Sequence, residues 1–196
     1  MTDEYALLGV KSRRKPNTAT MFSDADNIER QLQADGHKIW GWVIYRSTYE
    51  NVDDWKEFLS RLQARTADTI DFWGGSDMLD SLDYKIFDDR GLFDRASTAT
   101  IREHFKNWTA TAPLDEQGTG PGTSQRYLCC IQVDAEALHP VVYDAPPLSR
   151  ADASTTGWVK LVWRDWEFDE RSLGDGGEEV VDVETTGIGS IAGHRS

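Results

Sequence analysis

The stretch KIWGWVIYRSTY, residues 38–49, decides the fold that this sequence predicts. Ten of its residues, Ile39 to Thr48, have the aromatic and β-branched composition of a strand. Successive side chains of a strand point to opposite faces of a sheet, and here both rows begin with apolar residues. Neither face is therefore freely solvated, which indicates an interior strand. Polarity grows toward Arg46, so we expect that end to lie nearer water.

A helix is predicted directly after this strand, at NVDDWKEFLSRLQART, residues 51–66. Asn51 is a suitable N-cap, and the acids that follow it favour the positive end of the helix dipole. The apolar residues recur at the spacing of a single helix face, and they are Trp55, Phe58, Leu59 and Leu62. Strand and helix together form the start of a βα unit.

The remaining elements predict an α+β fold. We expect strands at 83–89, 126–134 and 158–168, a second helix at 97–110, and a loop at 111–125. The two helices each have one apolar stripe to bury. The expected architecture is therefore a mostly antiparallel four-stranded sheet with helices on one face, of ferredoxin-like character.

The length of 196 residues suits one domain, which we place at 37–168. Residues 1–36 are expected to be irregular or weakly helical, with one short helix ending at Gly36. Residues 169–196 are acidic and glycine-rich, and we expect them to be partly ordered.

One face of the expected sheet would be left without helices. The tryptophans of the strands, Trp40 or Trp42 with Trp158 and Trp166, make a bare, wet face implausible. We therefore expect either an aromatic-lined cavity or a homodimer interface on that face.

Charge limits the possible partners. The formal net charge is −13, and residues 165–184 alone hold nine acids against one base, Arg171. Duplex nucleic acid is an improbable partner, because its binding requires lysine and arginine at the phosphates. The one basic cluster, KSRRK at 11–15, is typical of a solvated tail; a nuclear-localisation or RNA-contacting patch is the alternative.

Several features predict a cytoplasmic protein. The N-terminus carries acids where a secretory signal needs bases, and no apolar segment has the ~20 residues of a membrane span. The only cysteines, Cys129 and Cys130, are neighbours in a predicted strand and therefore point to opposite faces. They are poor disulfide partners, and unpaired thiols are typical of a reducing compartment.

Four segments within residues 38–168 resemble a large family of uncharacterised small intracellular proteins of filamentous fungi. They are WGWVIYRSTYENVDDW (40–55), IFDDRGLFDRASTATIREHF (86–105), RYLCCIQVDAEAL (126–138) and WVKLVWRDWEF (158–168). Where the relatives have a glycine-tryptophan step, this chain reads Ile-Gly-Ser at 188–190. The resemblance implies a fungal origin and an intracellular globular fold, and it assigns no catalytic residue.

Arg46 is the first candidate functional residue. On a strand rich in tryptophan and isoleucine, a guanidinium needs an anionic partner or a route to water. It is either a carboxylate or phosphate clamp in a pocket, or part of an ion pair with Asp88, Asp89 or Asp165. Simple exposure at the strand end is the third reading, and the last two are the more typical.

Asp89 and His104 are the other candidate catalytic residues. The charged turn DDRGLFDR, residues 88–95, offers carboxylates for acid–base chemistry or Mg²⁺, although a self-satisfied charged turn is more common. His104 lies beside the apolar stripe of the second helix, where it is either a base facing the sheet or a histidine bonded to a neighbour. The histidines show no metal-ligand spacing, and no nucleotide motif is present, so we expect no metal and no cofactor.

The candidate ligand-binding residues are Trp42, Tyr45, Arg46 and Trp163. They predict a protein that binds a small apolar or acidic ligand, or an accessory acid–base enzyme, isomerase-like or cyclase-like, of fungal specialised metabolism. The alternative is a non-catalytic interaction protein, either a homodimer through the aromatic sheet face or a partner-binding protein through its acidic tail.

Overall fold

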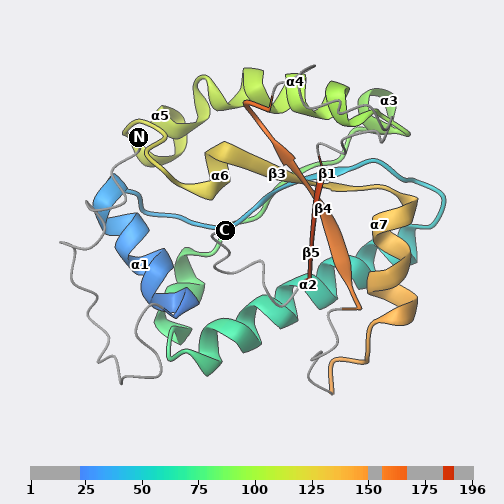
Figure 1. Cartoon of the computed structure of the whole chain (residues 1–196), viewed down its shortest axis with the longest axis horizontal. Helices are drawn as coiled ribbons and strands as arrows, with labels where there is room; N and C mark the ends of the chain where they lie inside the picture. The colour runs from blue at the N-terminus through green and yellow to red at the C-terminus, as the bar shows by residue number, and fades with distance from the viewer. Residues whose placement is uncertain (1–22, 150–155, 167–182, 188–196) are drawn as a thin grey trace, which may run out of the picture.

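The computed structural model describes residues 23–149, 156–166 and 183–187. It contains a single sheet with the strand order β2-β1-β3-β4-β5 (Figure 1). The strands are β1 (Val43–Arg46), β2 (Lys85–Phe87), β3 (Cys129–Val133), β4 (Trp158–Trp163) and β5 (Val183–Gly187). The Lys11–Lys15 cluster and most of the acidic 165–184 segment lie outside the described residues.

The sheet is mixed, and the expectation of a mostly antiparallel sheet is wrong. β1 pairs in parallel with both β2 and β3, whereas β4 is antiparallel to β3 and to β5. Four strands therefore run in one direction and only β4 opposes them. Helices connect β1 to β2 and β2 to β3. Each connection is a crossover that brings the chain back to the end of the sheet where the next parallel strand begins. The α+β class is confirmed, but ferredoxin-like character is not.

Helices fill most of the chain between the strands. They are α1 (Asp24–Asp35), α2 (Val52–Phe72), α3 (Arg90–Phe93), α4 (Thr98–Thr109), α5 (Ala112–Gln117), α6 (Gln125–Leu128) and α7 (Ala135–His139), with the 3₁₀ helix η2 (Ser76–Ser81) and the π-helical turn η3 (Pro140–Asp144). The predicted loop at 111–125 is thus partly wrong, because α5 lies inside it. The short helix predicted before Gly36 is confirmed, and Gly36 ends it in the left-handed conformation, at φ 68°.

Helices cover both faces of the sheet, so the expectation of helices on one face is wrong. Figure 1 shows α2 and α4 on opposite sides of the strands. On what we call the α2 face, Ile44 and Ile131 pack against Phe58 of α2. On the α4 face, the neighbouring strand residues Val43 and Tyr45 pack against α3 and α4. Both side-chain rows of β1 are apolar, so both need a covering layer, and the chain supplies two.

The cap and the apolar stripe predicted for α2 are confirmed. The Asn51 side chain accepts hydrogen bonds from the backbone N–H groups of Asp53 and Asp54. Phe58 and Leu62 are fully buried against the sheet. Burying a side chain of this kind contributes about 1.5–3 kcal/mol. The helix extends beyond the predicted end at Thr66, to Phe72.

A buried arginine holds the amino ends of the parallel strands together. Arg126 of α6 donates to the backbone carbonyl oxygens of Asp83 and Gly41, at 2.7 and 3.4 Å, and forms ion pairs with the Glu116 and Asp83 carboxylates. Gly41 has φ 121°, and a Cβ there would lie 2.3 Å from the Asp83 carbonyl oxygen. The glycine between Trp40 and Trp42 is therefore required by a close backbone approach.

Candidate functional site

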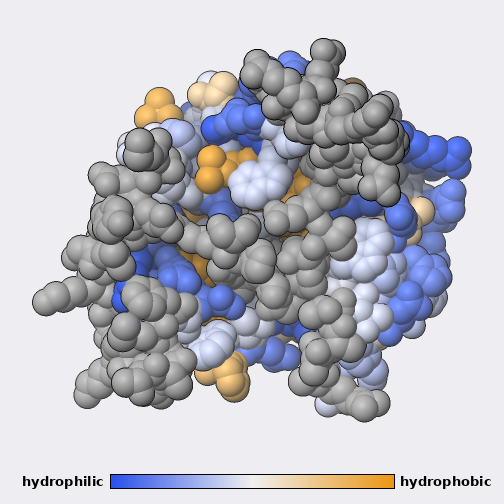
Figure 2. Space-filling view, in the orientation of Figure 1, coloured by the Kyte–Doolittle hydropathy of each residue, from blue (hydrophilic) through white to orange (hydrophobic). Residues whose placement is uncertain are grey.

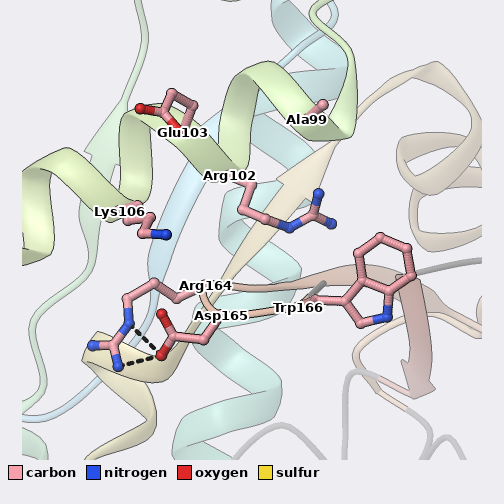
Figure 3. Close-up of a pocket in the computed structure, with 7 residues that line it drawn as sticks. All are labelled: Ala99, Arg102, Glu103, Lys106, Arg164, Asp165 and Trp166. Atoms are coloured by element: carbon pink, nitrogen blue, oxygen red, sulfur yellow. Dashed lines mark hydrogen bonds and ion pairs between the residues drawn. The ribbon is translucent and has the colours of Figure 1, made fainter. Parts of the chain in front are cut away.

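A basic pocket lies between α4 and the residues that follow β4 (Figure 3). Its volume is about 230 Å³. The residues that line it are Ala99, Arg102, Glu103, Lys106, Arg164, Asp165 and Trp166. Three of them are cationic and two are acidic, so the lining carries a net positive charge in a chain whose formal net charge is −13.

The cationic pair on α4 follows from a local pattern. Arg102 and Lys106 are four residues apart on α4, which places their side chains on the same side of the helix. Figure 3 shows both side chains on the side of α4 that faces Arg164 and Trp166. α4 is held against the sheet by Ile101 and Phe105, which are fully buried.

Arg164 and Asp165 form the floor of the pocket. The Arg164 Nε donates to Asp165 Oδ2 at 2.8 Å, and Nη1 donates to the Tyr127 carbonyl oxygen at 2.9 Å. The hydrogen bond from Arg164 and the charge of Lys106 lower the pKa of Asp165. Asp165 is therefore ionised at neutral pH, and a weakly basic carboxylate of this kind is a poor general base.

The other two cations differ in how firmly they are held. Arg102 Nε donates to the Trp163 carbonyl oxygen at 2.9 Å, and its guanidinium lies 5.1 Å from the centre of the Trp166 ring. Burial lowers the pKa of Arg102. Lys106 is exposed, and its ammonium group makes no hydrogen bond or ion pair with another residue that the structure describes. The pocket thus combines fixed guanidinium groups with one adaptable ammonium.

Arg46, the leading candidate from sequence, lies outside this pocket, at the carboxyl end of β1. Its side chain is buried, and Nη1 lies 3.3 Å from Asp88 Oδ2. The guanidinium also lies 4.4 Å from the ring centre of Tyr49 and 5.1 Å from that of Trp55. Of the readings left open, the ion pair with Asp88 is the one observed.

Asp89 lies at the same end of the sheet as Arg46, whereas His104 lies apart from both. The Asp89 carboxylate caps α3, accepting from the N–H groups of Gly91 and Leu92. His104 lies on the α4 face, where its Nδ1 is 2.8 Å from the Tyr45 hydroxyl oxygen. Each of the two side chains has a structural partner, and neither faces the basic pocket.

The tryptophans and Tyr45 are core residues. Trp42 is 6% exposed and packs on the α2 face, whereas Tyr45 is fully buried on the opposite face. Trp163 packs at the edge of the α2-face core. These side chains belong to the packed hydrophobic clusters on the two faces of the sheet.

Sequence reasoning missed the basic pocket because its residues belong to two distant segments. The spacing of Arg102 and Lys106 was a readable signal for one half of the pocket. Nothing local connects them to Arg164 and Trp166, which reach α4 only through the pairing of β3 with β4.

Neither family models nor curated proteins nor solved structures give a match to this chain. The resemblance to a fungal family therefore stays a prediction. Within residues 23–149, 156–166 and 183–187, no helix is long and apolar enough to cross a membrane. In the same part of the chain, no group of three or more His, Cys, Asp or Glu side chains is arranged to hold a metal ion.

Proposed function

We propose that this protein binds a small acidic molecule in the basic pocket between α4 and the end of β4. The observation that carries the proposal is the convergence of three cationic side chains from two elements on one concave site of about 230 Å³. Arginine and lysine are the side chains that recognise carboxylate and phosphate groups. The negative charge of the rest of the chain makes such a concentration of cations distinctive.

The dimensions and lining of the pocket define the ligand class. Pockets for drug-sized ligands hold about 300–1,000 Å³, so this pocket suits a smaller molecule. Lys106 and Arg102 would contact its carboxylate or phosphate group, and Trp166 offers a planar apolar surface beside them. A small organic acid or phosphate ester fits this chemistry.

Binding without acid–base turnover is the function that this lining supports. Asp165 is held as an anion by Arg164, and His104 of the same helix is bonded to Tyr45 on the side that faces the sheet. The enzymatic alternative drew on Arg46, Asp89 and His104, and of these His104 lies apart from the other two. A role in fungal specialised metabolism rests on the family resemblance alone and stays a prediction.

The proposal of a homodimer rested on an aromatic sheet face without helices. Helices cover both faces of the sheet, so this reason for a homodimer no longer applies. The exposed apolar residues of the described chain, including Phe72, Leu92 and Leu114, come from separate helices. Figure 2 shows hydrophilic as well as hydrophobic residues on one face of the molecule.

The proposal is tested by titrating the protein with benzoate, citrate and inorganic phosphate at pH 7 and low salt. We expect at least one of these anions to bind saturably and to shift the Trp166 indole N–H resonance. The Lys106→Gln variant should bind at least ~10-fold more weakly, since a hydrogen bond to a charged group contributes about 1.5–3 kcal/mol.

Lys56→Gln is the matched control, because Lys56 is an exposed lysine of α2 that forms an ion pair with Asp53 on the same helix. This variant changes the net charge equally and should leave affinity unchanged. Equal weakening by both variants would indicate unspecific attraction. That result, or the absence of saturable binding to all three anions, would refute the proposal.

A further inference from the structure

The helices that follow β1 and β2 diverge to opposite faces of the sheet. β1 leads into α2 on the α2 face, and the neighbouring strand β2 leads into α3 and α4 on the α4 face (Figure 1). In open α/β sheets, ligands bind outside the carboxyl ends of two adjacent strands whose connections diverge in this way. Arg46 ends β1 at this point, and Asp88 follows the last residue of β2.

The guanidinium of Arg46 is incompletely satisfied at this position. Its side chain is 7% exposed. Nε donates to the Thr48 carbonyl oxygen at 2.9 Å, and Nη1 donates to Asp88 Oδ2 at 3.3 Å. Nη2 is buried and has no hydrogen-bond partner among the described residues. A buried charged donor without an acceptor is unfavourable, so an oxygen placed there would be bound strongly.

The surroundings hold this donor in place. The rings of Tyr49 and Trp55 lie against the guanidinium, 4.4 and 5.1 Å from its Cζ. Cation–π contacts of this kind orient the planar group. The Asp88 side chain, which forms the ion pair with Arg46, is 40% exposed to solvent.

The charges at this edge are mixed, with the Arg46 and Arg90 guanidinium groups beside the Asp88 and Asp89 carboxylates. The Asp89 carboxylate is occupied in capping α3. The Arg90 guanidinium lies 6.0 Å from the centre of the Tyr49 ring and adds positive charge nearby. Burial and the Asp88 carboxylate raise the pKa of Tyr49, so its hydroxyl keeps its proton and is a second donor at this edge.

We propose that the carboxyl ends of β1 and β2 form a second site, which binds the carboxylate or phosphate group of a small ligand through Arg46 Nη2. The ligand oxygen takes the acceptor position that the described chain leaves empty, beside Asp88. This site is separate from the basic pocket and does not depend on it, because the two share no residue.

The test is a titration of the full chain with acetate and with inorganic phosphate, followed by NMR. The Trp55 indole N–H resonance reports on the second site, and the Trp166 resonance reports on the basic pocket. We expect a saturable shift of the Trp55 signal. Arg46→Lys, which keeps the charge but removes Nη2, should weaken that binding at least 10-fold. Asp88→Asn should strengthen it several-fold, because it removes the competing negative charge.

Arg95→Gln is the matched control, since Arg95 is an exposed arginine paired with Glu50 near the same edge.

A response to acetate alone would assign a carboxylic acid as ligand, and a response to phosphate alone would assign a phosphorylated one; both support the site. If Arg46→Lys does not fold, Asp88→Asn decides by itself. Unchanged or weaker anion binding in Asp88→Asn, with lowered thermal stability, would show a purely structural ion pair and overturn the proposal. Lys106→Gln should alter only the Trp166 response, so either proposal can fail without the other.

Discussion

At the scale of single residues, the two arginines that are buried among the described residues contrast in how their donors are used. Arg126 has an acceptor for each of its three nitrogen atoms, supplied by Glu116, Asp83 and Gly41. Burial would lower its pKa, but the hydrogen bonds and charges of Glu116 and Asp83 outweigh burial and raise it. Arg46, in contrast, leaves one nitrogen without an acceptor. Complete satisfaction is typical of a structural arginine, and incomplete satisfaction motivates a search for a ligand.

Replacing Arg126 by methionine should destabilise the fold markedly. The substitution leaves Glu116 without its buried partner and frees the backbone carbonyl oxygen of Asp83. We expect a loss of about 3 kcal/mol, the low end for breaking a buried pair, because the Asp83 carboxylate is half exposed. Urea unfolding measures the difference. Arg95→Met, at an exposed arginine, is the control and should change stability by less than about 0.5 kcal/mol. Similar losses in both variants would contradict this assignment.

At the scale of elements, α2 shows which features are readable from local sequence. Its cap, its acidic first turn and its apolar stripe follow from the positions of Asn51, Asp53 and Phe58 within one continuous segment. α4 begins at Thr98, one residue after the start of the helix predicted at 97–110, because Ser97 is its N-cap and accepts from the Thr100 N–H.

The Asn51→Ala variant should lose about 1 kcal/mol of stability, because two N–H groups of the first turn lose their acceptor. Thermal or urea unfolding gives this value. Asn107→Ala removes an identical side chain from the interior of α4, where its amide bonds only to Glu103 at the surface, and should be close to neutral. An equal cost at both positions would mean that Asn51 does not act as a cap.

At the scale of the whole molecule, the sheet lies between two helical layers, and the layers are joined to it by a few polar contacts. One of these is the hydrogen bond between Tyr45 of β1 and His104 of α4. Burial lowers the pKa of His104 and raises that of Tyr45. Tyr45 therefore keeps its proton, and it donates to Nδ1 only while the imidazole is neutral.

Stability should consequently fall in mildly acidic solution. The pKa of His104 in the folded protein lies below its ordinary value of 6.5, so the unfolded chain binds more protons in the interval between the two values. The contribution of the contact is complete above about pH 6.5 and is lost as the pH falls toward the folded pKa. Melting temperatures at pH 5 and pH 8 should differ less in His104→Gln than in the natural chain. An NMR titration midpoint for His104 at or above 6.5 would contradict this account.

Local pattern determined much of this protein: the α+β class, the cap and stripe of α2, the interior character of β1, and the alternation that separates Cys129 from Cys130. Each of these depends on neighbours within a few residues, and the periods of 2 and 3.6 report such neighbours directly. Only the tertiary structure decided that β1 pairs in parallel with β2 and β3, that both faces are covered, and that Arg46 meets Asp88. It alone placed Arg102 and Lys106 against Arg164. Strand direction and the grouping of charges depend on contacts between segments that are far apart along the chain, and no local period encodes those contacts.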